Sequence, residues 1–318
     1  MTPPPPLGRP RRKGGPAFDP ALDDAALATA RDALGRGRWA AARDLLAGTG
    51  DDWDRRGHRL VVLAEGACSA ARAREWQLAE PGSPDAAALL ACATVRRAVA
   101  GGESPETARA ACLAAARLAP ADPSPWLAVL VLAHRTGTDD ERARAFDQVR
   151  ARHRDHHHAH HLMAACLAER QRGDRDDPLH EVYDFASWAA EQAPADSPLA
   201  VLPVVAHAER YRVLARAGLE PRDPARSGHW TGRRARQVMK AAFDWWLEWD
   251  VDDGTAHPRR KIDLNYLAHA KLHEGRPAET AALLTRIGPH ATPAPWSYPD
   301  RDPRKAFQAA CRATFGAA

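Results

Sequence analysis

The stretch SPETARAACLAAARLAPADPSPWLAVLVLAHRTG, residues 104–137, indicates how the whole chain is built. It predicts two helices joined by a tight corner. The Ser104 side chain can cap the free N–H groups of the first helix, and Pro105 stands at the first helical position, where its missing donor costs nothing. Asp122 and Pro123 repeat this pattern for the second helix. Similar pairs recur at Asp19-Pro20, Ser83-Pro84, Asp177-Pro178, Ser197-Pro198 and Asp302-Pro303. The chain is therefore expected to consist of many short helices that begin in the same way.

Length and composition favour an all-α fold. The chain has 318 residues, with only 6 phenylalanines and 4 tyrosines among many alanines, arginines and leucines. Small side chains let helices pack closely, whereas an extensive sheet draws on β-branched and aromatic residues. We therefore expect an array of roughly twelve to fourteen helices, identified by their apolar spacing and by the residues that start and end them.

Composition also divides the chain into segments. Residues 1–17 combine prolines, arginines and glycines, which cannot build a core, and are expected to form a disordered tail. Helical repeats are expected at 18–218 and, continuing the same array, at 229–318. The polar, proline-bearing stretch between them, residues 219–228, is interpreted as a linker. Within the first array, residues 52–80 are expected to form one helix.

The charge and cysteine patterns argue against several classes of protein. The formal net charge of +4 is accounted for by Arg9, Arg11, Arg12 and Lys13, so the body has no basic excess of the kind that binds phosphate backbones. Weak nucleic-acid binding through this tail is kept as a second alternative function. The 5 cysteines are far apart and are interpreted as small buried hydrophobes of a reduced, cytoplasmic protein. No apolar run approaches the about 20 residues that cross a bilayer, and no nucleotide-binding motif is present.

The opening stretch resembles the tetratricopeptide (TPR) repeat, which is about 34 residues long. The matching positions are small residues in the second helix of one repeat, the proline that closes it, and the large residue and turn glycine of the next: Ala108, Cys112, Ala115, Pro120, Trp126 and Gly137. PWLAVLVLAH at 125–134 is echoed by PLAVLPVVAH at 198–207. The chain resembles uncharacterised TPR-like helical proteins common in actinobacteria. The resemblance implies a right-handed solenoid of helical hairpins, with a concave face suited to a protein or peptide partner.

The helix expected at 229–250 carries the candidate partner-binding residues. Basic residues crowd its start and tryptophans its later turns, and both aromatic residues and arginine are enriched at protein interfaces. Burial of the tryptophans between helices is the competing interpretation. Acidic residues crowd the end of the helix, against its dipole, and residues 259–261 of an antiparallel neighbour are expected to neutralise them. Our leading hypothesis is a non-catalytic scaffold or adaptor whose groove is formed by Trp230, Arg233, Arg234, Arg236, Lys240, Trp245 and Trp249.

The run HRDHHHAHH, residues 153–161, carries the alternative hypothesis of a metal-binding protein or metalloenzyme. If this run is helical, His156 with His160 and His157 with His161 lie four residues apart on one face, the spacing at which a helix chelates a divalent cation. The spacing identifies no third ligand, and the simpler interpretation is a solvated or pairing cluster at a helix start. We therefore expect no metal and no other cofactor, and keep these four histidines as the alternative site.

Overall fold

The computed structural model describes residues 16–170, 179–249 and 257–316, which form sixteen α-helices and three short 3-10 helices, with no β-strand among them. The N-terminal half contains α1 (Ala25–Gly35), α2 (Ala40–Ala47), α3 (Trp53–Ala64), α4 (Ser69–Ala79), α5 (Pro84–Val99), α6 (Pro105–Leu118), α7 (Ser124–Thr136) and α8 (Asp139–Arg150). The C-terminal half contains α9 (His157–Ala168), α10 (Glu181–Gln192), η1 (Pro198–Val201), α11 (Leu202–Arg216), η2 (Pro224–Arg226), η3 (Gly228–Trp230), α12 (Arg233–Trp249), α13 (Arg260–Glu274), α14 (Pro277–Ile287), α15 (Pro293–Trp296) and α16 (Pro303–Phe315). The all-α prediction is confirmed.

The predicted start signals are confirmed at Ser83, Ser104, Ser197 and Asp302, whose side chains cap the elements that follow. The signal at Asp19-Pro20 is wrong, because a turn follows it and α1 begins only after Asp24, and Asp177-Pro178 lies outside the described residues. The Ser104 hydroxyl accepts a hydrogen bond from the Thr107 N–H at 3.1 Å, and Pro105 is the first residue of α6. The Asp122 carboxylate accepts a hydrogen bond from the Ser124 N–H at 2.7 Å, where α7 begins. A side-chain cap therefore sets the start of α6, whereas Asp122 holds the corner just before α7, whose N-cap is Pro123.

The predicted number of helices is wrong, because short turns divide the chain more often than its apolar pattern indicates. Residues 52–80, expected as one helix, form α3 and α4 with a turn at Gly66 between them. A Cβ atom on Gly66 would lie 2.8 Å from the Ser69 hydroxyl oxygen. That hydroxyl donates a hydrogen bond to the Leu63 carbonyl oxygen at 2.6 Å, so it is held in the turn. The short helix α15 adds a further element.

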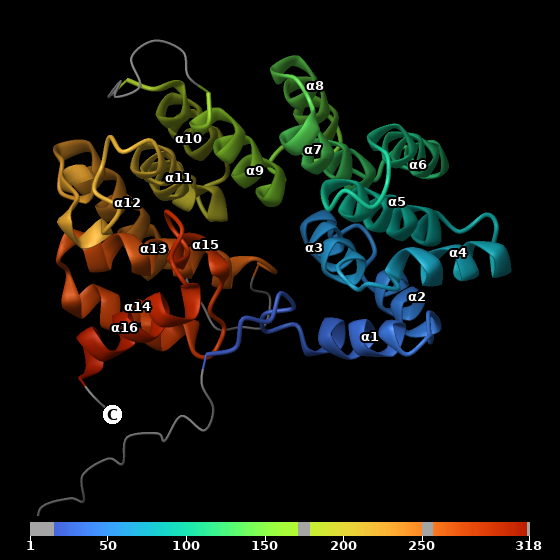
Figure 1. Cartoon of the computed structure of the whole chain (residues 1–318), viewed down its shortest axis with the longest axis horizontal. Helices are drawn as coiled ribbons and strands as arrows, with labels where there is room; N and C mark the ends of the chain where they lie inside the picture. Colours follow the sequence, from blue (N-terminus) through green and yellow to red (C-terminus); the bar gives the residue numbers. More distant parts are fainter. Residues whose placement is uncertain (1–15, 171–178, 250–256, 317–318) are drawn as a thin grey trace, which may run out of the picture.

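The helices pack in two rows. In the first row, α3, α5, α7, α9, α11 and α13 contact one another in succession. In the second row, α4, α6, α8, α10 and α12 each pack against the first-row helices before and after them, and α14 packs against α13. The first row curves strongly enough for α3 to contact α9 as well as α5 and α7 (Figure 1). Helices that are distant in sequence are thereby brought together on the inside of the curve.

The N-terminal segment of the described chain packs against the C-terminal helices. The Ala17 N–H donates a hydrogen bond to the Pro289 carbonyl oxygen at 2.8 Å, and the Phe18 ring packs edge-on against Phe307. Figure 1 shows this segment, in blue, crossing beside the orange and red helices before α1 begins. Ala17 is thus anchored, whereas residues 1–15, including Arg9, Arg11, Arg12 and Lys13, lie outside the described residues.

The segment 219–228 is tied to its surroundings. The Tyr211 hydroxyl donates a hydrogen bond to the Pro221 carbonyl oxygen at 2.8 Å, and Arg222 forms an ion pair with Asp300 at 2.8 Å. Pro224 in η2 is buried. These contacts attach the segment interpreted as a linker to α11 and to the loop before α16.

The cysteine prediction holds for three residues and fails for one. Cys92, Cys112 and Cys166 are buried among helices, whereas Cys68 is exposed because it lies in the turn before α4. All five are free thiols. Separately, none of the helices in the described ranges is long and apolar enough to cross a membrane.

Candidate functional site

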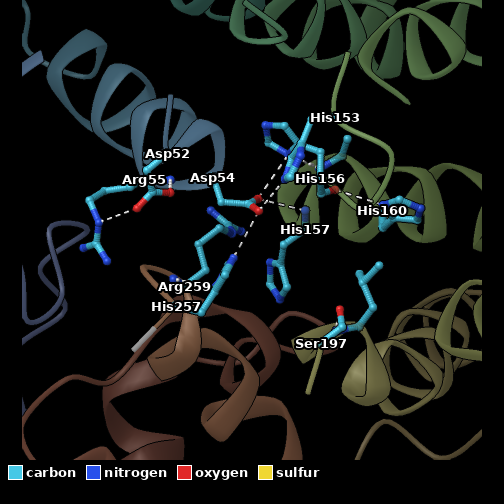
Figure 2. A network of polar contacts seen from close by, with 12 residues as sticks. Asp52, Asp54, Arg55, His153, His156, His157, His160, Ser197, His257 and Arg259 are labelled. Carbon is cyan, nitrogen blue, oxygen red and sulfur yellow. Dashed lines mark hydrogen bonds and ion pairs between the residues drawn. The ribbon is translucent and has the colours of Figure 1, made fainter. Parts of the chain in front are cut away.

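The starts of α3, α9 and α13 meet inside the curve, and the side chains there are polar. Asp54, in the first turn of α3, accepts a hydrogen bond from the His157 backbone N–H at 2.9 Å and contacts His153 Nε2 at 2.9 Å. The same carboxylate lies 3.5 Å from both His156 Nδ1 and His257 Nε2. Figure 2 shows these contacts reaching Asp54 from the start of α9 and, on the other side, from His257 just before α13. Asp54 therefore links the three helix starts.

His157, His161 and Asp263, which we call the His–His–Asp group, lie between α9 and α13. His157 Nε2 lies 3.0 and 2.8 Å from the two carboxylate oxygens of Asp263, and His161 Nε2 lies 3.1 Å from one of them. One possible ligand atom from each residue lies within 4.8 Å of the other two. The three residues are 1%, 7% and 4% exposed. In the described part of the chain this is the one such group of three or more residues that could hold a metal ion.

Burial determines the ionisation of this group. Desolvation lowers the pKa of His157 to about 3, because the charged imidazolium loses its hydration. Burial by itself raises the pKa of Asp263, but the electrostatic attraction and hydrogen bond of His157 outweigh it and hold that pKa well below its usual range. At neutral pH the pair therefore consists of a neutral imidazole and a carboxylate, the forms in which both residue types bind metals.

His156 and His160 turn away from the His–His–Asp group. His160 Nδ1 contacts the His156 carbonyl oxygen at 2.9 Å, and its ring packs edge-on against Phe146 with 5.0 Å between the ring centroids. His156 is fully buried against α3, where a Cβ atom on Gly57 would lie 3.1 Å from His156 Nε2. The predicted face of four histidines is thus divided. The cluster pairs with carboxylates, as one interpretation expected, but it is buried rather than solvated.

A cleft of about 550 Å³ adjoins the His–His–Asp group. His161 lines it, so one residue belongs to both features. The same three helices contribute one partly buried apolar side chain each to the lining: Val61 from α3, Leu162 from α9 and Ile262 from α13. The cleft therefore combines an apolar wall with a polar, buried margin.

Arg259 brings a positive charge to the lining of this cleft. The residue is 9% exposed, and its Nε atom has no hydrogen-bond partner among the described residues. Burial lowers the pKa of Arg259 to about 10, although Asp263 and Asp54 act in the opposite direction. The guanidinium is still charged at neutral pH, and Figure 2 shows it near Asp54 and His257.

The polar cluster leaves several buried atoms without partners. Among the described residues, His157 Nδ1, His161 Nε2 and Arg259 Nε have no hydrogen bond, although His161 Nε2 lies within 3.1 Å of Asp263. An unsatisfied buried polar atom costs about 1–3 kcal/mol. Other buried histidines of the described chain, such as His58 and His207, also have ring nitrogens without partners, so these atoms alone do not distinguish the cluster.

The structure places the predicted partner-binding residues in different environments. Trp230 is fully buried and packs against Tyr211 with 5.2 Å between the ring centroids. The half-buried Trp245 donates a hydrogen bond to the Ala195 carbonyl oxygen at 2.8 Å. The remaining predicted residues are exposed on α12: Arg233, Arg234, Arg236, Lys240 and Trp249. Trp230 is therefore a core residue, and the others leave α12 with a basic, accessible face.

The expected pairing of residues 259–261 with the acidic end of α12 stays a prediction, because most of that acidic end lies outside the described residues. Arg259 faces the histidine cluster, and Lys261 Nζ donates a hydrogen bond to the Arg286 carbonyl oxygen at 2.7 Å. Lys261 also lies 3.8 Å from Asp23, near the N-terminus. Within the described residues, these contacts connect Arg259 with the histidine cluster and Lys261 with α14 and the N-terminal segment. Three of the acidic residues, Asp250, Asp252 and Asp253, lie outside the described residues.

Sequence reasoning missed Asp54, Asp263 and the role of Arg259. His157 and Asp263 are 106 residues apart, so no local pattern could join them. The one local signal is weak: Asp263 is the acidic residue in the first turn of α13, two residues after a run of three basic residues. A comparison of the chain with known protein families, characterised proteins and solved structures finds no match to any of the three.

Proposed function

We propose that this protein binds a divalent transition-metal ion through His157, His161 and Asp263 and exposes it to the adjoining cleft. The observation that carries the proposal is the convergence of two imidazole nitrogens and a carboxylate in a buried space between two helices. Two histidines and one carboxylate are the ligand set of catalytic zinc sites and of non-haem iron sites, both of which keep coordination positions open.

The distances within the group suit such an ion. Around a tetrahedral zinc ion, with metal–ligand bonds of about 2.1 Å, ligand atoms lie about 3.4 Å apart. The nitrogen–oxygen distances of 2.8 and 3.1 Å from His157 and His161 to Asp263 need only a small expansion to reach this spacing. Because His161 also lines the cleft, an open coordination position of the ion would face it. There the metal would supply a Lewis acid to a molecule in the cleft.

The test is metal analysis of untagged protein. Chelator-treated chain is incubated with Zn²⁺ or, without oxygen, with Fe²⁺, dialysed and analysed for bound metal. We expect an equimolar ion in the wild type and at least about tenfold weaker binding in His157→Gln, His161→Gln and Asp263→Asn. His160→Gln is the matched control, since His160 is a buried histidine on the same helix that faces Phe146. Equal metal content in the wild type and Asp263→Asn would refute the proposal.

For the architecture, we propose that the two rows of helices form a TPR-like right-handed solenoid. The alternation of first-row and second-row helices supports this, as does the burial of Ala108, Cys112 and Ala115 on one face of α6. At the predicted turn position Gly137, a Cβ atom would lie 2.9 Å from Ala133 Cα, so the turn requires glycine.

A second candidate function is the binding of a protein or peptide partner by the basic face of α12. Arg233 and Arg236 are exposed and have no ion-pair partner among the described residues, which favours an acidic partner. The test compares Arg233→Glu/Arg236→Glu with Arg312→Glu, an exposed arginine on α16, in capture from native lysate. We expect loss of a specific partner in the double variant only. Unchanged recovery would eliminate this surface.

A further inference from the structure

We propose that the cleft beside the His–His–Asp group binds a small organic carboxylate with an apolar body, its carboxylate lying against Arg259. This inference rests on the proposed function for its link to the metal, although the cleft and Arg259 are independent of it. The cleft is lined both by apolar side chains and by the buried guanidinium of Arg259, whose Nε has no hydrogen-bond partner among the described residues.

Arg259 supplies the anion recognition. A guanidinium presents a planar set of N–H donors that matches a carboxylate in a bidentate manner. Arg259 is 9% exposed, lines the cleft, and leaves Nε without a hydrogen-bond partner among the described residues. A buried charge of this kind is costly unless an anion compensates it. Asp54 and Asp263 compensate part of the charge of Arg259, and a ligand carboxylate in the cleft would add a direct hydrogen-bonding partner.

The apolar side chains of the cleft indicate that the part of the ligand beyond its carboxylate is apolar. Val61, Leu162 and Ile262 come from three different helices and line the same cleft. Each methylene group buried against such a wall contributes about 0.8 kcal/mol. A volume of about 550 Å³ lies within the range of small-molecule sites. Longer aliphatic acids should therefore bind more tightly than acetate.

Charge couples this ligand to the metal. Without a metal, Arg259 shares the region with the carboxylates of Asp54 and Asp263, and Asp19 and Glu65 also line the cleft. These acidic groups oppose the binding of a further anion. A divalent ion at the His–His–Asp group shifts the local charge by two units toward positive. The metal should therefore strengthen carboxylate binding. By thermodynamic linkage the carboxylate should strengthen metal binding by the same factor.

Isothermal titration of the chelator-treated full chain with octanoate, with and without prior loading with Zn²⁺, tests the inference. We expect octanoate to bind the zinc-loaded protein at least tenfold more tightly than the metal-free protein, and more tightly than acetate, octanol or inorganic phosphate. Arg259→Gln should weaken octanoate binding at least tenfold. Leu162→Trp, which fills the cleft from the apolar side, should also weaken it while equimolar zinc is retained. Arg55→Gln is the matched control, since Arg55 pairs with Asp52 at the start of α3 and points away from Asp54 (Figure 2).

The outcomes separate this inference from the proposed function. Octanol binding as tightly as octanoate, phosphate binding more tightly, or unchanged binding by Leu162→Trp would overturn the carboxylate site. Zinc binding without octanoate binding would overturn this inference and leave the metal site intact. Octanoate binding that requires Arg259 but is the same with and without zinc would support the carboxylate site and count against the metal.

Discussion

Replacement of Arg56 should lower the free energy of unfolding more than replacement of an exposed arginine. Arg56 lies in α3, and its Nε donates to Asp122 at 2.7 Å while its Nη2 donates to Asp85 at 2.6 Å. The side chains of Arg56 and Asp122 are 7% and 2% exposed. This pair joins α3 to the start of α5 and to the corner before α7.

The magnitude follows from the burial of the partner. Arg56→Met keeps most of the apolar stem but leaves the Asp122 carboxylate buried without its cation, which costs about 3–5 kcal/mol in the free energy of unfolding. Arg43→Met is the matched control. Arg43 is 42% exposed and pairs with Asp44 and Glu80 in solvent, so its loss should lower stability far less than the loss of Arg56.

Urea unfolding followed by circular dichroism measures both variants. The double variant Arg56→Met/Asp122→Asn should recover part of the loss, because it removes the uncompensated charge. A loss in Arg56→Met no larger than that in Arg43→Met would refute the reasoning that burial makes this ion pair important.

Three further predictions concern stability. His207 is buried and its pKa is lowered to about 3 by desolvation, so its contribution to stability is present above the unfolded value near 6.5 and is lost as the pH falls. Between pH 7 and pH 5 the wild type should lose about 2 kcal/mol more than His207→Phe in urea unfolding, and equal losses would contradict this. Gly57→Ala should lower the free energy of unfolding by about 1–3 kcal/mol, because the added Cβ would lie too close to His156 Nε2. In the control Gly35→Ala the added Cβ meets no atom within 4 Å, so thermal unfolding should show a neutral or stabilising effect. Trp230→Ala should cost about 3–5 kcal/mol as a core truncation, whereas the 41% exposed Trp249→Ala should stay within about 0.5 kcal/mol; similar losses would show that Trp230 is not a core anchor.

The helix starts were predictable because their chemistry is local. Ser104 and Asp122 each bond to a backbone N–H two or three residues away, so the same short sequence that begins a helix also contains its cap. The division between α3 and α4 was harder to predict. The turn at Gly66 depends on the Ser69 hydroxyl reaching back to Leu63, and the apolar spacing continues across it.

The candidate site was predictable only in part. The spacing of His157 and His161 on one helix face indicated two ligands, because a helix brings residues four apart together whatever surrounds it. The same rule paired His156 with His160, and tertiary packing turned these two toward α3 and Phe146 instead. Whether a helical face becomes a site depends on what packs against it.

By itself, the sequence determined that this chain forms short helices, where many of them begin, and that a histidine pair could act on one face of α9. Capping and helix periodicity act over a few residues, so they can be recognised in the sequence. Only the tertiary structure decided that Asp263, 106 residues from His157, completes the His–His–Asp group, and that Arg259 turns to the cleft rather than to α12. Both features depend on the packing angles of many successive helix pairs, which together curve the array and bring α3, α9 and α13 close to one another. No single segment of the sequence determines that curvature.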